Sequence, residues 1–227
     1  MINDNSKPLI FLGSNSAMAK QFDICDLTGI KIAGIIDSDY WGNTDELHGV
    51  KVIDGFNNVG KYRDDYNFFI GSNWIPVQEA VHIRNAEKRK MIMNLVEDQK
   101  LSMISLVHPD ATISPRSTIG KGCYVDAGVV IEPNCVIGNY NHFYALCFIG
   151  HNMTIGNNCV IQRQCMVAHD AIMEDDCYFG LMSKAVKTKC IWRKGTFVQE
   201  GIYIKRGTSE NEIVTADSKP RVRSMRI

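Results

Sequence analysis

The stretch IGHNMTIGNNCVIQRQCMVAH, residues 149–169, carries an apolar residue at every sixth position and a histidine near each end. A period of six matches neither the 3.6-residue turn of an α-helix nor the alternation of an ordinary strand, so the stretch belongs to another kind of repeating structure. His151 and His169 occupy the same position in their repeats, three repeats apart. The nature of the repeat therefore decides how the two histidines are placed.

The six-residue pattern runs without interruption from Val107 to Tyr203. Its members are all apolar: Val107, Ile113, Ile119, Val125, Ile131, Ile137, Phe143, Ile149, Ile155, Ile161, Val167, Met173, Phe179, Ala185, Ile191, Phe197 and Tyr203. We expect these residues to form the interior of one structure that no insertion interrupts.

Small residues recur at two other positions of each repeat. Six of the eight cysteines stand two positions before an apolar member: Cys123, Cys135, Cys147, Cys159, Cys165 and Cys177. Free cysteine behaves as a compact buried hydrophobe, and no CxxC pair is present, so we interpret these thiols as interior filler rather than metal ligands or disulfides. Glycine often stands one position after the member, which fits a corner where the backbone turns with no side chain in the way.

The composition narrows the class of protein. The chain has 227 residues with 25 basic and 25 acidic side chains, and no basic run is interleaved with aromatics, so nothing indicates a nucleic-acid groove. No apolar run approaches the length of a membrane span, and the first residues lack an apolar signal core. We expect a cytoplasmic protein whose partners are small molecules.

The first hundred residues predict a small parallel α/β sheet. Buried strands are expected at 9–13, 30–36 and 68–70, and helices at 17–27 and 76–98. The turn after the first strand lacks GxGxxG, so the match to a dinucleotide fold is weak, and the strands are too few for a full NAD domain. Open α/β sheets bind ligands at the carboxyl ends of their strands, where the candidate binding residues are Gly13, Ser14, Asn15, Asp37, Gly71, Ser72 and Asn73. The alternative is that these are ordinary turn residues and that Asp37 caps a loop.

A hexad with a bulky apolar residue, a small residue and a corner glycine resembles the hexapeptide repeat of the left-handed parallel β-helix. In that family three hexads form one triangular coil, and coils stack at strand spacing. The resemblance implies that His151 and His169 are stacked neighbours on one edge of a prism.

The junction VHPDATISPRSTIGKG at 107–122 resembles that of the sugar acyltransferases typified by PglD and of the NeuD-type sialic acid O-acetyltransferases. This resemblance implies a Rossmann-like domain at 1–104 that holds a UDP-linked amino sugar, a left-handed β-helix at 105–207, and a tail at 208–227. It also implies homotrimers with acetyl-CoA in the groove between subunits. Gly180, Gly195 and Gly201 would leave room for its pantetheine arm, and basic residues of the tail, Lys219, Arg221, Arg223 and Arg226, could meet its phosphates or simply be solvated.

The family's catalytic histidine lies in a motif of the type I-x-H-[ED], and Ile149-Gly150-His151-Asn152 matches it at the histidine. His151 is therefore the expected general base, and a backbone N–H near His169 the expected oxyanion stabiliser. Asn152 stands where the family has an acid, and Glu132 is a possible substitute. Two stacked imidazoles would disfavour double protonation, which would keep His151 neutral.

These features favour an acetyl-CoA-dependent N-acetyltransferase that modifies a nucleotide-linked amino sugar. The expected acceptor is a 4-amino-4,6-dideoxyhexose for surface glycans such as lipopolysaccharide. Three alternatives stay open: O-acylation of a sugar hydroxyl, an inactive nucleotide-sugar-binding scaffold, and a γ-type carbonic anhydrase. The last needs three convergent imidazoles, for which His142, His151 and His169 are the candidates. We expect no metal.

Overall fold

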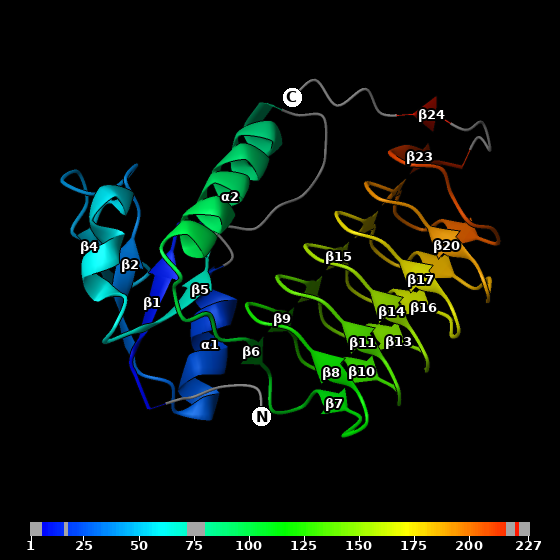
Figure 1. Ribbon diagram of the computed structural model, residues 1–227, viewed down its shortest axis with the longest axis horizontal. Helices are drawn as coiled ribbons and strands as arrows, with labels where there is room; N and C mark the ends of the chain where they lie inside the picture. Colours follow the sequence, from blue (N-terminus) through cyan, green and yellow to red (C-terminus); the bar gives the residue numbers. More distant parts are fainter. Residues whose placement is uncertain (1–5, 16–17, 72–79, 217–220, 223–227) are drawn as a thin grey trace. The chain divides into compact units, whose positions relative to one another are not determined.

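The computed structural model describes residues 6–15, 18–71, 80–216 and 221–222, with side chains described outside 80–85 and 221–222. The chain forms two compact units, Met1–Pro109 and Asp110–Ile227 (Figure 1). Among the described helices, none has both the length and the apolar character that a membrane span requires.

The N-terminal unit is a mainly parallel sheet with the strand order β3-β4-β2-β1-β5, in which only the short β3 is antiparallel to its neighbour. Its strands are β1 (Leu9–Leu12), β2 (Ile32–Ile36), β3 (Glu46–Leu47), β4 (Val50–Asp54) and β5 (Asn67–Ile70). Its helices are α1 (Met18–Thr28), the 3-10 helix η1 (Phe56–Tyr62) and α2 (Ala80–Asp98).

The predicted strands and helices of this unit are present, while β3, β4 and η1 were not predicted. Residues 76–79 of the predicted second helix lie outside the described residues. The centre of the sheet is apolar because β1 and β5 are buried along their whole length. Phe11 of β1 packs edge-on against Phe22 of α1, with ring centroids 5.0 Å apart.

The C-terminal unit is built mainly from two-residue strands, and each strand in the middle of the unit pairs with the third strand before it and the third after it. The strands are β7 (Thr112–Ile113), β8 (Thr118–Ile119), β9 (Tyr124–Val125), β10 (Val130–Ile131), β11 (Val136–Ile137), β12 (His142–Phe143), β13 (Phe148–Ile149), β14 (Thr154–Ile155), β15 (Val160–Ile161), β16 (Met166–Val167), β17 (Ile172–Met173), β18 (Tyr178–Phe179), β19 (Lys184–Ala185), β20 (Ile191–Trp192), β21 (Phe197–Val198) and β22 (Tyr203–Ile204). They are preceded by β6 (Leu106–Val107) and followed by β23 (Glu212–Val214) and β24 (Arg221–Val222).

This pairing produces a three-sided coil. One face stacks β7, β10, β13, β16, β19 and β22, the second β8, β11, β14, β17 and β20, and the third continues from β9 through β12, β15, β18 and β21 to β23 and β24. Ile131 pairs with Ile149, and Ile149 with Val167, so one coil takes eighteen residues up to β19. Strands of one face are seen stacked along the unit in Figure 1.

The predicted interior is confirmed from Val125 to Ala185. In each strand of this stretch the predicted apolar member is buried, and the six repeat cysteines are buried beside it. Their thiols are hydrogen-bonded within the coil; Cys135 Sγ, for example, donates to the carbonyl oxygen of Gly150 at 3.2 Å. Burial raises the pKa of Cys159, which keeps this thiol protonated.

The prediction of an uninterrupted repeat was wrong beyond Ala185. Ile172 pairs with Ile191, nineteen residues later, so one extra residue lies between β19 and β20. As a result the interior residues of the last strands are Trp192, Val198 and Ile204. The predicted members Ile191 and Phe197 are only partly buried, and Tyr203 is 54% exposed. The sequence did not reveal this shift by one residue, because both residues of each of these two-residue strands are apolar.

The corners of the coil follow a common backbone pattern. From Val125 to Phe179, the third residue after each interior member adopts a positive φ, which is 63° at Asn134, 56° at Asn152 and 55° at Asp170. The glycines that follow interior members serve close stacking, as predicted: a Cβ on Gly156 would lie 2.8 Å from the backbone nitrogen of Asp175 in the next coil.

Candidate active site

Two successive corners of the repeat bring His151 and His169 together, as the sequence predicts. His151 follows β13 and His169 follows β16, and these strands are hydrogen-bonded neighbours. The imidazole rings are stacked with centroids 4.5 Å apart and planes inclined by 9°. Both side chains remain nearly half exposed, at 43% and 46%. The pair is therefore accessible from solvent.

Glu132, from the corner one coil before His151, holds this histidine at two points. Its Oε2 accepts from the His151 backbone N–H at 2.9 Å and contacts the ring Nδ1 at 3.1 Å. A carboxylate only accepts, so the neutral ring carries its proton on Nδ1 and keeps the Nε2 lone pair free. The sequence named Glu132 as a possible partner but did not reveal the direction of its side chain.

His169 has a carboxylate partner of its own. Its Nδ1 lies 2.8 Å from Oδ2 of Asp170, the next residue. Asn152 does not replace an acid beside His151; its Nδ2 donates to Asp170 Oδ1 at 2.8 Å, and its Oδ1 accepts from Asn134 Nδ2 at 3.1 Å. The hydrogen bonds from Asn152 and then from His169 lower the pKa of Asp170. Asp170 is thus held as a carboxylate.

The backbone N–H of His169 is a candidate donor for an oxyanion. In the described part of the chain this N–H has no acceptor. A Cβ on Gly150 would lie 3.0 Å from the His169 nitrogen. Glycine at this corner therefore leaves the space next to the amide open.

A shallow groove of about 390 Å³ includes the two residues that directly follow the histidines in the chain. Asn152 and Asp170 line one part of it, and the rest is formed by Thr154, Ala171, Ile172, Lys189, Cys190 and Ile191. The groove combines an apolar floor with polar groups at the histidine end. These properties suit a ligand with an extended, partly apolar arm.

A metal site is not supported by the geometry of the pair. Candidate ligand atoms of His151, His169 and Asp170 lie within 4.8 Å of one another. However, Zn²⁺ needs lone pairs that converge on one point at about 2.0–2.1 Å, and the lone pairs of two stacked rings run parallel. His142 is not part of this cluster; it is buried, with its ring 5.7 Å from Tyr124 and 6.2 Å from Tyr144. The alternative of a γ-type carbonic anhydrase, which would need His142 to converge with His151 and His169, is therefore not favoured.

Asp37 directly follows β2 at the strand ends of the N-terminal unit. Its carboxylate is fully buried and accepts from Ser14 Oγ at 2.7 Å and from the Asp39 N–H at 3.1 Å. Lys88 Nζ of α2 contacts both oxygens, at 2.7 and 2.8 Å, and also Asp39 Oδ2. Its oxygens are thus engaged within the protein. Lys88 was not predicted, because no local pattern links a helix residue to a strand end 51 positions earlier.

The other predicted binding residues lie at the same edge. Gly13 follows β1 with a φ of 75°, and Asn15 Nδ2 donates to the carbonyl oxygen of Gly71 after β5. Ser72 and Asn73 lie outside the described residues.

Comparison with known proteins places this geometry in a wider context. Residues 116–151 match the family described as bacterial transferase hexapeptide (six repeats). A mutant of perosamine N-acetyltransferase from Caulobacter crescentus, solved in complex with CoA and GDP-perosamine, superimposes with a TM-score of 0.80 at 18% identity, covering 95% of this chain and 97% of that chain. The chain has the fold of the hexapeptide-repeat sugar acetyltransferases.

Two other acetyltransferase-fold structures cover this chain to the same extent. WeeI from Acinetobacter baumannii AYE gives a TM-score of 0.76 at 17% identity, covering 95% of this chain and 99% of that chain. The acetyltransferase domain of PglB from Neisseria gonorrhoeae FA1090, in complex with acetyl coenzyme A, gives 0.58 at 18% identity with coverages of 95% and 99%. No curated protein matches by sequence. The resemblance recognised at the domain junction is confirmed for the repeat and the fold.

Within this fold, the three glycines predicted to receive the donor have structural explanations. A Cβ on Gly180 would lie 2.5 Å from the backbone nitrogen of Glu200, and Gly195 and Gly201 adopt φ values of 71° and 69°. None of the three lines the groove beside the histidines. Their role toward a cofactor remains a prediction.

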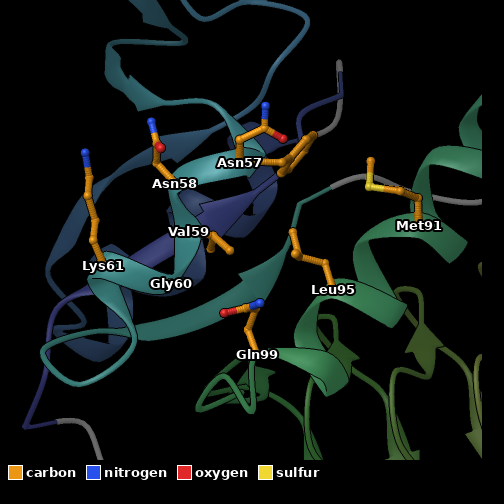
Figure 2. A pocket seen from close by; sticks show the side chains of 9 residues that line it. Asn57, Asn58, Val59, Gly60, Lys61, Met91, Leu95 and Gln99 are labelled. Carbon is orange, nitrogen blue, oxygen red and sulfur yellow. The ribbon is translucent and has the colours of Figure 1, made fainter.

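The N-terminal unit of this acetyltransferase fold also contains a cavity that the sequence did not suggest, of about 560 Å³ (Figure 2). It is lined by residues 56–61 of η1, by Met91 and Leu95 of α2, and by Gln99, which follows the end of α2. Figure 2 shows these two groups of side chains on opposite sides of the opening. Next to it, burial of Asp54 is outweighed by hydrogen bonds from Lys61, Asn58, the Gly55 N–H and Tyr62, which lower its pKa to about 2.

Proposed function

We propose that this protein is an acetyl-CoA-dependent N-acetyltransferase that acts on a nucleotide-linked amino sugar, with His151 as the general base. The observation that carries the proposal is the pairing of Glu132 with Nδ1 of His151. It orients a half-exposed imidazole with Nε2 free to accept a proton.

In this reaction the acceptor nitrogen attacks the thioester carbonyl of acetyl-CoA, and His151 Nε2 takes the proton that the nitrogen loses. The negative charge on the tetrahedral oxygen is stabilised by the backbone N–H of His169, beside Gly150. The carbon–sulfur bond then breaks and CoA leaves. Glu132 stabilises the imidazolium that forms on His151.

The proposed donor site is the groove that begins at Asn152 and Asp170, where the pantetheine arm would lie over Ile172 and Ile191. Gly180, Gly195 and Gly201 and the basic tail stay candidates for further CoA contacts. Support for CoA comes from similar structures that were solved in complex with CoA or acetyl coenzyme A.

The proposed acceptor is bound through its nucleotide by the N-terminal unit, at the strand ends that carry Gly13, Ser14, Asn15 and Gly71. Because Asp37 is saturated by protein donors, we assign it to shaping this edge rather than to holding the ribose directly. A similar structure was solved with GDP-perosamine, which supports a 4-amino-4,6-dideoxyhexose as the sugar.

The finer architecture belongs to the same proposal. We take the coil to be left-handed, with domains at 1–104 and 105–207 and a tail at 208–227. The protein would act as a homotrimer in the cytoplasm, in the synthesis of surface glycans such as lipopolysaccharide.

O-acetylation of a sugar hydroxyl is the second candidate, and one observation favours it. A hydroxyl must lose its proton during attack, which requires a base supported by a carboxylate. Asn152 offers no such support, but Glu132 does.

The test is to incubate the purified full chain with acetyl-CoA and a panel of UDP-, dTDP- and GDP-linked amino sugars, while thiol release is followed. Matched sugars with a hydroxyl in place of the amine form the second arm. Release with an amino sugar alone supports the proposal, and release with the hydroxyl sugar supports the second candidate. Nucleotide-sugar binding without thiol release in either arm would indicate an inactive scaffold.

A further inference from the structure

The two stacked histidines each have their own carboxylate. His151 Nδ1 faces Glu132 at 3.1 Å, and His169 Nδ1 faces Asp170 at 2.8 Å. Stacking alone would make a second positive charge unfavourable, but two imidazolium rings beside two carboxylates have no net charge. Each imidazolium that forms would therefore have a carboxylate as its counterion.

Asn152 is what makes the second carboxylate possible. The ladder Asn134–Asn152–Asp170 climbs one corner of the coil, and its amides donate in sequence until Asp170 receives the last hydrogen bond. An acid at position 152 would face Asp170 with a like charge. The neutral amide instead leaves Asp170 charged and aligned with His169.

Asp170 also orients the ring of His169. As an acceptor it selects the neutral tautomer with the proton on Nδ1, so Nε2 is left as the acceptor, as in His151. The rings are nearly parallel and both are partly exposed. Two proton acceptors are thus presented side by side on two stacked, partly exposed rings.

We propose that His169 is a second proton acceptor and that the acceptor substrate arrives as an ammonium ion, which must lose two protons to become an amide. This inference rests on the proposed function. A hydroxyl loses only one proton and would not require a second base. The presence of two proton acceptors therefore favours an amine as the acceptor group.

The protons balance as follows. His169 Nε2 takes one proton from the ammonium and leaves a neutral amine. The amine lone pair forms the nitrogen–carbon bond to the thioester carbonyl, and the proton left on nitrogen passes to His151 Nε2. As the carbon–sulfur bond breaks, His169 returns its proton to the sulfur, giving free CoA thiol, and His151 later releases its proton to water.

The first test reads the tautomers without any substrate. In protein labelled with ¹⁵N-histidine, NMR above the pH at which the rings titrate should show both His151 and His169 neutral with the proton on Nδ1. His151→Phe and His169→Phe assign the signals. An Nε2–H tautomer in either ring would overturn the inference whatever the enzyme's substrate is.

The second test is kinetic and uses His169→Phe, which retains an aromatic ring for stacking but accepts no proton. At pH 7 we expect kcat/KM to fall by roughly 10- to 100-fold, because the variant can use only the small fraction of substrate whose amine is already neutral. The loss should shrink as the pH rises towards that at which the substrate amine is itself neutral, and the acid limb of the profile should change from two protons to one. A loss that is equal at all pH values would contradict the relay.

Asn152→Leu tests the ladder, with Asn158→Leu as its matched control. Asn158 occupies the equivalent corner position with the same positive φ and donates to Asp176 at 2.9 Å, away from the histidines. Only the first variant should shift the pH profile towards that of His169→Phe. If the wild-type enzyme transfers no acetyl group, the proposed function fails, whereas the NMR result still decides the arrangement of the pair.

Discussion

Carboxylates serve opposite purposes in the two units of the chain. In the N-terminal unit Asp37 is fully buried, and Ser14, Lys88 and a backbone N–H occupy its oxygens. In the repeat unit Glu132 and Asp170 are partly exposed, and each directs one imidazole while leaving its far nitrogen open. A carboxylate at a candidate binding edge therefore indicates a ligand contact only if its oxygens are not already hydrogen-bonded to protein groups.

The buried and the partly exposed carboxylates should also contribute to different properties, the first to the stability of the fold and the second to proton transfer. Loss of a partner from the buried cluster leaves a charge without compensation, and the cost falls on folding. Loss of a partner from the partly exposed corner is relieved by water, and the cost falls on orientation and proton transfer. Variants of the two sites should consequently affect different measurements.

The sharpest way to test this difference is His151→Ala. We expect kcat/KM for acetyl transfer to fall by about 10²- to 10⁴-fold, because the general base is lost while the coil is intact. Thermal unfolding should hardly change, since the side chain is 43% exposed. A variant as active as the wild type would remove His151 from the mechanism.

Lys88→Met tests the buried side of the comparison. It should destabilise the N-terminal unit by about 3–5 kcal/mol, because Asp37 then remains buried without its cation. Denaturant unfolding measures the change. The double variant Asp37→Asn/Lys88→Met should recover much of the loss; if it does not, the Asp37–Lys88 pair is not the source of the effect.

Glu132→Gln should affect activity more than stability. The amide can donate to Nδ1 and so favour the unproductive tautomer, and we expect kcat/KM to fall on the order of a hundredfold. Unfolding curves are the control. The comparison fails if this variant unfolds early while its activity per folded molecule is unchanged.

The smallest expected effect concerns pH and Asp54. Its pKa of about 2 in the folded chain lies below the unfolded value of about 4, so its contribution is complete above that pH and is lost as the pH falls towards 2. The size is on the order of 1–2 kcal/mol. Unfolding of wild type and Asp54→Asn from pH 5 to pH 2 should show a weaker pH dependence in the variant.

The repeat could be predicted because its period and its burial coincide. From Val125 to Ala185 each predicted interior position is buried, and the stacking of His151 on His169 follows from pairing across one coil. The direction of Glu132 could not be predicted, because a corner side chain can point along the coil or away from it. Lys88 was missed for a different reason: its contact with Asp37 depends on how a distant helix packs on the sheet.

Because of the extra residue before β20, two registers can be considered for the last strands, which differ in the residues that point into the coil. If Ile191, Phe197 and Tyr203 pointed inward, the positions that need a positive φ would fall on Lys194 and Glu200; in the observed frame they fall on Gly195 and Gly201. Residues such as Asn152 and Asp170 also adopt a positive φ at this corner position, but glycine does so at the lowest cost. Gly195 and Gly201 thus favour the observed register of the last strands. Replacing them with alanine should allow the last coils to fold out of register.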